Sequence, residues 1–465
     1  TPDWSIAAGD YNADGFNDLL YAAWGGVTFM KSNGDMTFTK ETYNDYVASQ
    51  RSNFVDLNND GHLDAFVCHD IAPSVYYMND GSGNLTFYRS PAIGETNDSP
   101  YQLAAYFSGG NYGSIWIDYD NDRNIDMFIA KCGGEFPRYV NQMHRNTGEE
   151  VVDYVENAAD IGLDDDDQTW SAAWGDFDND GDMDVFVGAS SGPHVLKVNN
   201  GEAAGYTFTD ITASSGVDAL GATSREHVTF DFDNDGYLDI VSGRNVLRNN
   251  GDMTFTVFSN VFSGTGAFGD LNNDGFIDAY RGSTVFLNDG NSNNWIKLTT
   301  IGTDSNINGI GARVEVHTPS GTFMRDVRSG DGFEFMNSLN THIGLGAETV
   351  IDNIIIYWPS GNIDNIPNPN INEHIIVTEG QTLTVEDEVL AEVMIYPNPV
   401  KNVITIDSPV DLTNRIATVF DLSGKRVLNK KLTENTLDVS GLASGPYILR
   451  LESQGKSISR KFIKE

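Results

Sequence analysis

The sequence predicts an all-β chain: a β-propeller, then a small β module, then a C-terminal β-sandwich. Three observations predict this order. A nine-residue Asp-rich loop recurs six times between Asp10 and Asp278. Short apolar segments and Asn-Gly or Asp-Gly turns follow each loop, without a long helical period, which is typical of antiparallel sheets. Beyond residue 290 the loop disappears, and the charge changes again near the C-terminus.

The repeat spacing suits propeller blades. The first Asp of successive loops recurs every 39 to 62 residues, a range that fits four-stranded blades with surface insertions. Stacking the sheets radially would bury the apolar faces that each sheet alone leaves bare. We expect six motif-bearing blades and six or seven in total, since a seventh could lack the motif or precede Thr1.

Composition restricts the partners. The chain has 465 residues, a hydrophobic content of 40% and a net charge of −39. Such acidity argues against nucleic acid and anionic membranes as direct partners, and no apolar run is long enough for a transmembrane helix. The sequence starts at Thr1 without a leader, so we expect a removed signal peptide or a late start. Cys68 and Cys132 follow the second and third loops, and the sequence leaves a disulfide and two buried thiols equally open.

The loops have calcium-binding spacing, Asp-x-Asp/Asn-x-Asp-Gly-x-x-Asp. Ca²⁺ takes six to eight oxygen ligands. Positions 1, 3, 5 and 9 supply side-chain oxygens, position 7 a backbone carbonyl, and Gly at position 6 permits the sharp turn. Magnesium fits less well because it retains several waters. Solvated turns would explain one such loop, but not six in phase with the strands.

We therefore expect about six Ca²⁺ ions, which would change the net charge from −39 to −27. In the third loop Arg123 stands where Gly is expected, so it must adopt a Gly-like conformation or distort the loop. The predicted side-chain ligands, loop by loop, are Asp10, Asn12, Asp14 and Asp18; Asp56, Asn58, Asp60 and Asp64; Asp118, Asp120, Asp122 and Asp126; Asp176, Asp178, Asp180 and Asp184; Asp231, Asp233, Asp235 and Asp239; Asp270, Asn272, Asp274 and Asp278.

Residues 1–290 resemble the FG-GAP/VCBS repeats of integrin-α-type propellers. The resemblance rests on the six loops and implies calcium between the first two strands of each blade. Residues 291–383 are similar to the ASPIC/UnbV domain, through the segments NNWIKL, INGIGARVEV, HIGLG and IIIYWPSG. This domain order resembles the cartilage acidic protein family, which implies an extracellular, calcium-binding protein associated with adhesion and matrix. No catalytic activity follows from the resemblance.

The tail differs in charge from the rest of the chain. Residues 393–465 hold eleven Lys and Arg against seven Asp and Glu, whereas residues 1–392 hold 17 against 60. The segment 384–392 is expected to be an acidic linker. The tail resembles the C-terminal sorting domain of type IX secretion substrates of Bacteroidota, through its YPNP, DLSG and GPY segments and its basic end. The resemblance implies recognition by the translocon and, via the periplasm, a secreted or outer-surface protein of a Gram-negative cell.

No catalytic motif of hydrolases, zinc peptidases, P-loop or dinucleotide-binding proteins occurs. The sequence therefore favours a non-catalytic binding or adhesion protein with a surface glycan or a protein as its ligand. The alternative is a carbohydrate-active propeller, either a lectin or a polysaccharide lyase. Lectin propellers repeat aromatic residues at one loop position in each blade, and no such register is evident here.

Overall fold

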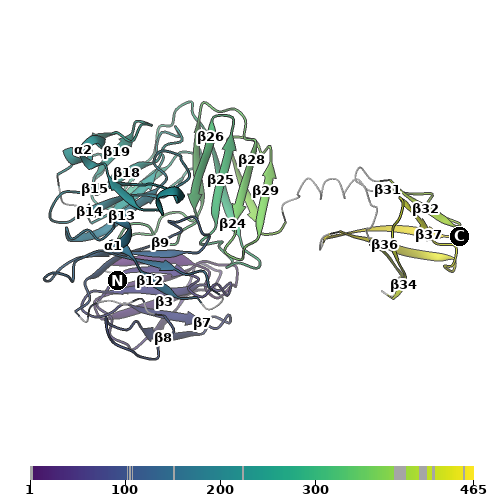
Figure 1. Cartoon of the computed structure of the whole chain (residues 1–465), viewed down its shortest axis with the longest axis horizontal. Coiled ribbons are helices and arrows are strands. Elements are labelled where there is room, and N and C mark those ends of the chain that lie inside the picture. The colour runs from purple at the N-terminus through teal and green to yellow at the C-terminus, as the bar shows by residue number, and fades with distance from the viewer. Residues whose placement is uncertain are drawn as a thin grey trace. The chain divides into compact units, whose positions relative to one another are not determined.

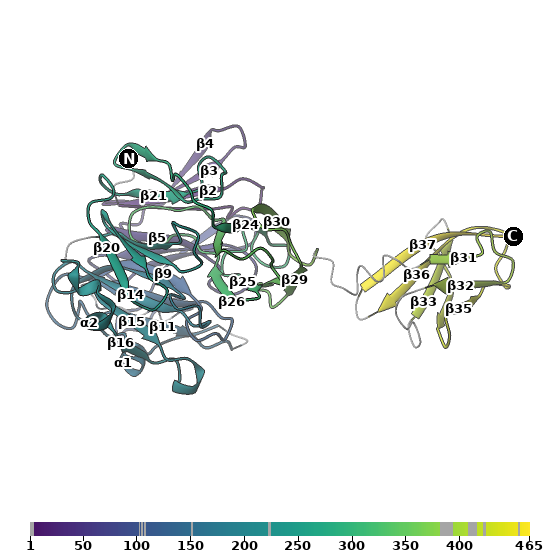
Figure 2. The same cartoon turned by 90° about the horizontal axis from the view of Figure 1, so that it is seen from above.

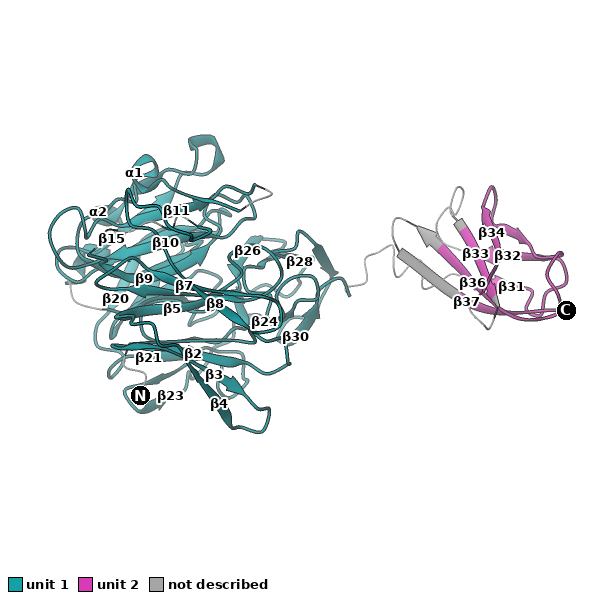
Figure 3. Ribbon diagram, turned by 90° about the horizontal axis from the view of Figure 1, so that it is seen from below, with its two compact units in different colours: residues 1–382 teal, residues 383–465 magenta. Residues whose placement is uncertain are grey.

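The computed structural model describes residues 4–101, 103, 106, 108–149, 152–221, 225–381, 394–407, 416–421, 425–453 and 456–465. The chain divides into two compact units, residues 1–382 and residues 383–465 (Figure 3). Within the described residues the secondary structure is almost entirely β, with four helices of three or four residues.

Six antiparallel sheets, here called sheets 1 to 6, follow one another in chain order. Each contains one Asp loop, between its first and second strands. Sheet 1 is β1 (Ser5–Gly9), β2 (Asp18–Ala23), β3 (Gly26–Ser32) and β4 (Phe38–Thr42). Sheet 2 is β5 (Ser49–Val55), β6 (Asp64–His69), β7 (Val75–Asn79) and β8 (Leu85–Arg89). Sheet 3 is β9 (Asn111–Ile117), β10 (Asp126–Lys131), β11 (Gln142–Asn146) and β12 (Tyr154–Glu156).

The next three sheets continue the pattern until the fourth strand is lost. Sheet 4 is β13 (Thr169–Gly175), β14 (Asp184–Ala189), β15 (Val195–Asn199) and β16 (Phe208–Asp210). Sheet 5 is β17 (His227–Phe230), β18 (Asp239–Ser242), β19 (Asn245–Asn249) and β20 (Phe255–Phe258). Sheet 6 has three strands, β21 (Gly266–Gly269), β22 (Asp278–Arg281) and β23 (Thr284–Phe286). The short helices lie before, within or after sheet 4: α1 (Ala158–Ile161), η1 (Glu202–Ala204), α2 (Thr212–Ser215) and η2 (Val217–Ala219).

The first strand of each sheet lies innermost. β1 packs against β5, β5 against β9, β9 against β13, and β13 against β17. Apolar clusters fill the space between neighbouring sheets, which is why strands β6, β10 and β14 are buried on both faces. This propeller-like stacking places all Asp loops at the same end of the innermost strands, because each loop follows the end of such a strand.

Residues 294–378 form two further sheets beside the repeats (Figure 1). One contains β24 (Asn294–Ile301), β27 (Thr341–Gly346) and β30 (Glu373–Thr378). The other contains β25 (Arg313–Thr318), β26 (Gly321–Asp326), β28 (Asn353–Tyr357) and β29 (Ile363–Pro367). Their apolar residues form one core together with those of sheets 1 and 2, so these two sheets, here called the module, belong to the same compact unit.

A segment of the module, residues 327–338, runs along the innermost strands; we call it the strap. The Ile6 amide of β1 donates to the Glu334 carbonyl at 3.0 Å, and the Ser338 amide donates to the Phe268 carbonyl of β21 at 3.2 Å. The strap thus links the first sheet to the sixth. Glycine is required at position 330, where the strap passes Arg51 of β5. A Cβ on Gly330 would lie 1.7 Å from the Arg51 guanidinium, and Gly330 has a φ of +99°.

The second unit has its own core, which includes Ile404, Val419 and Leu449. Its strands form two antiparallel sheets, as in a β-sandwich. They are β31 (Met394–Tyr396), β32 (Val403–Asp407) and β35 (Thr436–Asp438) in one sheet, and β33 (Ile416–Asp421), β34 (Arg426–Lys431), β36 (Gly445–Ser453) and β37 (Lys456–Lys464) in the other.

Candidate metal centre

The six Asp loops adopt one backbone conformation. The residue at position 4 is left-handed in every loop, with φ between +55° and +59° at Ala13, Asn59, Asn121, Asn179, Asn234 and Asn273. Asn tolerates this region better than most residues, and it stands there in five of the six loops. Arg123 also has a positive φ, +70°, so it takes up the conformation that Gly has in the other loops.

The aspartates at positions 1 and 9 hold the loop through backbone amides. In the fifth loop, Asp231 accepts hydrogen bonds from the amides of Asp235 (3.1 Å) and Gly236 (2.8 Å). Asp239 accepts from the amides of Phe232 (3.1 Å) and Asn249 (2.9 Å), which joins the loop to the end of the third strand. These two carboxylates are fixed by the fold itself, so the predicted ligands are positioned without an ion.

An Asn that the sequence reasoning missed connects neighbouring loops. The Asn249 amide group donates to the carbonyls of Phe177 in loop 4 (2.8 Å) and Leu238 in loop 5 (3.2 Å). Asn199 and Asn288 make the corresponding pairs of bonds. The signal was present, because this Asn ends the third strand ten or fifteen residues after the ninth loop position.

The loops contain oxygens suited to a cation. One carboxylate oxygen from each of three aspartates lies within 4.8 Å of the others in loops 3, 4 and 5, namely Asp118, Asp120 and Asp122; Asp176, Asp178 and Asp184; Asp231, Asp233 and Asp239. At position 3, the Oδ1 atoms of Asn12, Asp120 and Asp233 are buried and accept no hydrogen bond from the described residues. Buried oxygens without donors are costly unless a cation or water meets them, so these residues fit calcium.

Burial and crowding raise the pKa values of several loop carboxyls, among them Asp64, Asp176 and Asp231. Desolvation is the largest cause throughout, and neighbouring carboxylates add to it. It raises the pKa of Asp64 to about 8 and those of Asp176 and Asp231 to about 7. A bound divalent cation would reverse this tendency by favouring the ionised carboxylates.

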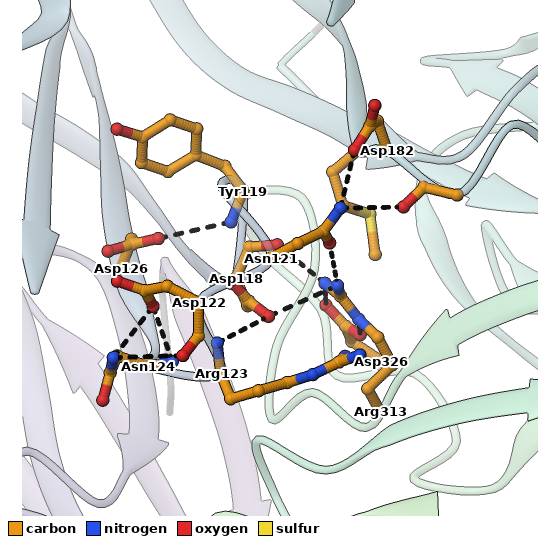
Figure 4. A network of polar contacts seen from close by, with 12 residues as sticks. Asp118, Tyr119, Asn121, Asp122, Arg123, Asn124, Asp126, Asp182, Arg313 and Asp326 are labelled. Carbon is orange, nitrogen blue, oxygen red and sulfur yellow. Dashed lines mark hydrogen bonds and ion pairs between the residues drawn. The ribbon is translucent and has the colours of Figure 1, made fainter. Parts of the chain in front are cut away.

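The module covers the end of the sheets that carries the loops. Lys297 Nζ lies 2.7 Å from Asp270 Oδ2 in loop 6, and both side chains are almost fully buried. Arg313 Nη1 lies 3.3 Å from Asp118 Oδ2 in loop 3 and also binds Asp326 (Figure 4). The Asp10 amide of loop 1 donates to Asn308 Oδ1 at 2.7 Å. Loops 1, 3 and 6 therefore each contact the module through their first Asp, a location that loop spacing did not indicate.

Loop 3 differs from the others in carrying its own cation. Arg145 Nε lies 2.5 Å from Asp120 Oδ2, and its Nη2 lies 3.0 Å from Asp122 Oδ2. Among the described residues no other loop has a Lys or Arg within 4.0 Å of positions 3 and 5. Arg145 neutralises part of the charge that would attract Ca²⁺, which should weaken this site.

The two cysteines, and a His and a Trp within the ASPIC/UnbV-like segments, have structural roles. Cys68 and Cys132 are free, buried thiols, and burial raises the pKa of Cys68 to about 12. The His342 Nε2–H donates to the Gly275 carbonyl at 2.9 Å, and the Trp358 indole donates to Asp364 Oδ2 at 2.8 Å. Both rings are thus packing residues of the module.

Comparison with protein families agrees with this architecture. Residues 10–67 and 118–187 match the FG-GAP-like repeat, and residues 169–207 match the FG-GAP repeat. Residues 302–384 match the ASPIC and UnbV family, and residues 394–465 match the secretion system C-terminal sorting domain. The chain is an all-β repeat protein exported by type IX secretion. It carries FG-GAP repeats, an ASPIC/UnbV domain and a sorting domain, and it reaches the outer cell surface or the medium. None of the described helices is long and apolar enough to cross a membrane.

The search of curated protein sequences gave no match. Three similar solved structures are distant matches. A lectin of Agrocybe aegerita, described as recognising non-reducing terminal N-acetylglucosamine, is 17% identical, with a TM-score of 0.39 over 62% of this chain and 81% of the lectin. PorZ, a surface component of the type IX secretion system of Porphyromonas gingivalis, is 12% identical, with a TM-score of 0.23 over 96% and 74% of the two chains. The rhamnogalacturonan lyase YesW is 12% identical, with a TM-score of 0.23 over 99% and 71%. Scores this low support no conclusion about function.

Proposed function

We propose that this exported protein is a calcium-stabilised propeller that binds a surface partner without catalysis. The observation that carries the calcium proposal is the recurrence of buried position-3 oxygens without donors in loops whose other ligands are already fixed. Calcium is abundant outside the cell, so affinities of about 10⁻⁴–10⁻³ M would suffice. The proposal extends to a closed ring of six motif-bearing blades over residues 1–290, the module over 291–383, the linker over 384–392 and the sorting domain over 393–465.

In this proposal the ions act as structural clamps. They would join the first and second strands of each blade and neutralise carboxylates that otherwise repel one another. The side chains of positions 1, 3, 5 and 9 would hold each ion, as set out above for the six loops. Loop 3 should bind most weakly, because Arg145 already contacts Asp120 and Asp122.

Metal content tests the proposal. The purified chain, equilibrated with 2 mM CaCl₂ and then passed through a desalting column in the same buffer, should hold about five to six Ca²⁺ by elemental analysis. Asp233→Ala should lower the content by about one ion, because it removes a position-3 oxygen that holds no backbone amide. Asp252→Ala is the matched control, since that exposed aspartate lies in the turn of the same sheet, outside the loop. A content below about four ions, or equal contents in the two variants, would contradict the calcium proposal.

A carbohydrate-active role is the second candidate. At the end of the innermost strands opposite the loops, Trp4, Tyr112 and Trp170 surround Phe333 with ring centroids 4.9 to 6.5 Å apart. The Arg225 guanidinium lies 5.4 Å from the Trp4 ring and 5.3 Å from the Trp170 ring. Aromatic rings beside a cation are suited to stacking with sugars and binding their polar groups.

A glycan array and a polysaccharide depolymerisation assay, each with and without EGTA, separate the roles. Binding that is lost in Trp170→Ala, without product formation, would support a lectin. Product formation would establish an enzyme and contradict the non-catalytic proposal. An absence of glycan binding would leave a protein as the expected surface partner.

A further inference from the structure

Sheet 6 lacks the fourth strand that each of the other five sheets has. In sheet 5, β20 pairs antiparallel with β19 and completes the outer edge. In sheet 6, β23 is the last strand, and no described strand pairs with its outer edge. β23 has the sequence Thr284-Val285-Phe286 and carries neither charge nor proline, the usual protections of an exposed edge.

The repeat register continues past β23 before the chain departs. A Cβ on Gly290 would lie 3.1 Å from the Phe276 ring, and a Cβ on Gly251 in sheet 5 would lie 3.1 Å from the Tyr237 ring. These are corresponding positions, since Phe276 and Tyr237 both occupy loop position 7. The turn after the third strand therefore has the same geometry in sheets 5 and 6. By this register, the strand that follows the turn should occupy the outer edge of sheet 6.

That next strand is β24, which joins the module instead. It pairs with β27 and β30, and Figure 2 shows β24 and β30 together. Trp295, the first aromatic residue after the turn, stacks on His342 with ring centroids 6.3 Å apart. No strand of the described residues occupies the outer position of sheet 6, because the strand that follows β23 in the chain pairs elsewhere.

In sheets 2 to 5 the fourth strand contributes an aromatic ring to the core shared with the preceding sheet. Phe87 of β8, Tyr154 of β12, Phe208 of β16 and Phe255 of β20 do so. Val257 of β20 packs into the same core as Phe255, two residues further along the strand. The missing strand therefore leaves sheet 6 without an aromatic and an aliphatic side chain.

A cavity of about 440 Å³ lies where those side chains would pack. It is lined mainly by apolar groups of sheets 5 and 6, among them Phe232, Val246, Phe258, Phe262, Phe286 and Leu287. The exposed fractions are 45% for Phe258 and 58% for Leu287. Between sheets 4 and 5, the connecting segment adds Val217 of the short helix η2 to the corresponding core. The segment that connects sheets 5 and 6 is residues 259–265 and contains no helix.

We propose that this vacancy is a docking site for an extended segment of a partner polypeptide, which adds to β23 as the fourth strand of sheet 6. The interface would continue the strand pairing that five sheets already show. The segment would run antiparallel to β23, with an aromatic and an aliphatic residue two positions apart facing the cavity. It should be basic at its flanks, because residues 1–392 carry 60 Asp and Glu against 17 Lys and Arg.

The probe is a peptide with the sequence of residues 252–260, DMTFTVFSN, which contains the chain's own fourth strand from sheet 5. Labelled with a fluorophore, it should bind the full chain in calcium buffer and raise the anisotropy saturably. Replacing Phe255 and Val257 of the peptide by Ser should weaken binding at least about tenfold. Replacing its terminal Asp252 and Asn260 by Lys should strengthen binding, with the gain lost at high salt.

Two matched variants of the full chain locate the site. Leu287→Asp places a charge in the cavity lining and should weaken peptide binding at least about tenfold. Leu271→Asp is the control, because that leucine is 53% exposed and does not line the cavity. No saturable binding, equal effects of the two variants, or equal binding of the Ser-substituted peptide would overturn the proposal. Dimerisation of the chain that Leu287→Asp abolishes would also overturn it, by making a second copy the occupant.

Discussion

Arg51 offers a direct test of the strap. Its side chain is fully buried, and its Nη1 donates to the carbonyls of Phe333 (3.2 Å) and Phe335 (2.9 Å). The Glu226 carboxylate, which accepts the amides of Phe333 and Glu334, contributes a favourable charge. Arg51→Met keeps most of the side-chain length but removes the charge and the donors. Two buried carbonyls and a buried carboxylate then lose a partner, which should lower the free energy of unfolding by about 3–5 kcal/mol.

Urea denaturation followed by tryptophan fluorescence measures this change. All seven tryptophans lie between Trp4 and Trp358, so the signal reports the first unit and not the sorting domain. Arg89→Met is the control, because Arg89 pairs with Glu95 near the surface and should change the midpoint little. A loss of less than about 1 kcal/mol in Arg51→Met would refute the reasoning that the strap stabilises the packing of the innermost strands.

Three further predictions follow from the loops and the tail. Asn249→Ala removes two bonds that join loops 4 and 5 and should cost about 2–3 kcal/mol in urea denaturation, whereas the exposed neighbour variant Asn250→Ala should cost far less. In EGTA the free energy of unfolding should fall as pH rises from about 4 to about 8. The reason is that Asp64, with a folded pKa of about 8, keeps a proton that the unfolded chain has lost. Saturating calcium should remove most of this slope, and an unchanged slope would argue against calcium at loop 2. Deleting residues 394–465, which match the sorting domain, should leave the protein in the periplasm of a type IX-competent cell. Fractionation and immunoblotting measure this, and surface display of the truncated chain would contradict the role of the sorting domain.

Much of the candidate site could be predicted because its determinants are local. Nine consecutive residues set each loop, and positions 1 and 9 accept amides only a few residues away, as in Asp231 with Gly236. Asp and Asn at alternate positions and Gly at position 6 are readable from spacing and residue type, whereas the left-handed residue at position 4 was found only in the structure. The conformation of Arg123 was left open by the sequence, and the structure shows that it is Gly-like.

The contacts of these loops with other parts of the chain could not be predicted from spacing. Arg145, which neutralises two aspartates of loop 3, is recognisable only once β11 is placed beside that loop. Lys297 reaches Asp270 across a boundary between repeats and module. The Asn at or just after the end of the third strand in sheets 2, 4, 5 and 6 resembled an ordinary turn residue until its bond to the preceding loop was visible.

The sequence by itself determined the β-rich repeats, the metal-type loops and the export signal, because each is encoded in a short stretch of residue types at fixed spacing. Only the tertiary structure decided three further features: the strap along the innermost strands, the module over the loops, and the departure of β24 that leaves sheet 6 incomplete. The physical reason is sequence separation. Arg51 and Phe333 are 282 residues apart, and pairing of such distant groups depends on how whole sheets pack against each other. Local propensity could not show that the strand after Gly290 would pair with β27 and β30 rather than with β23.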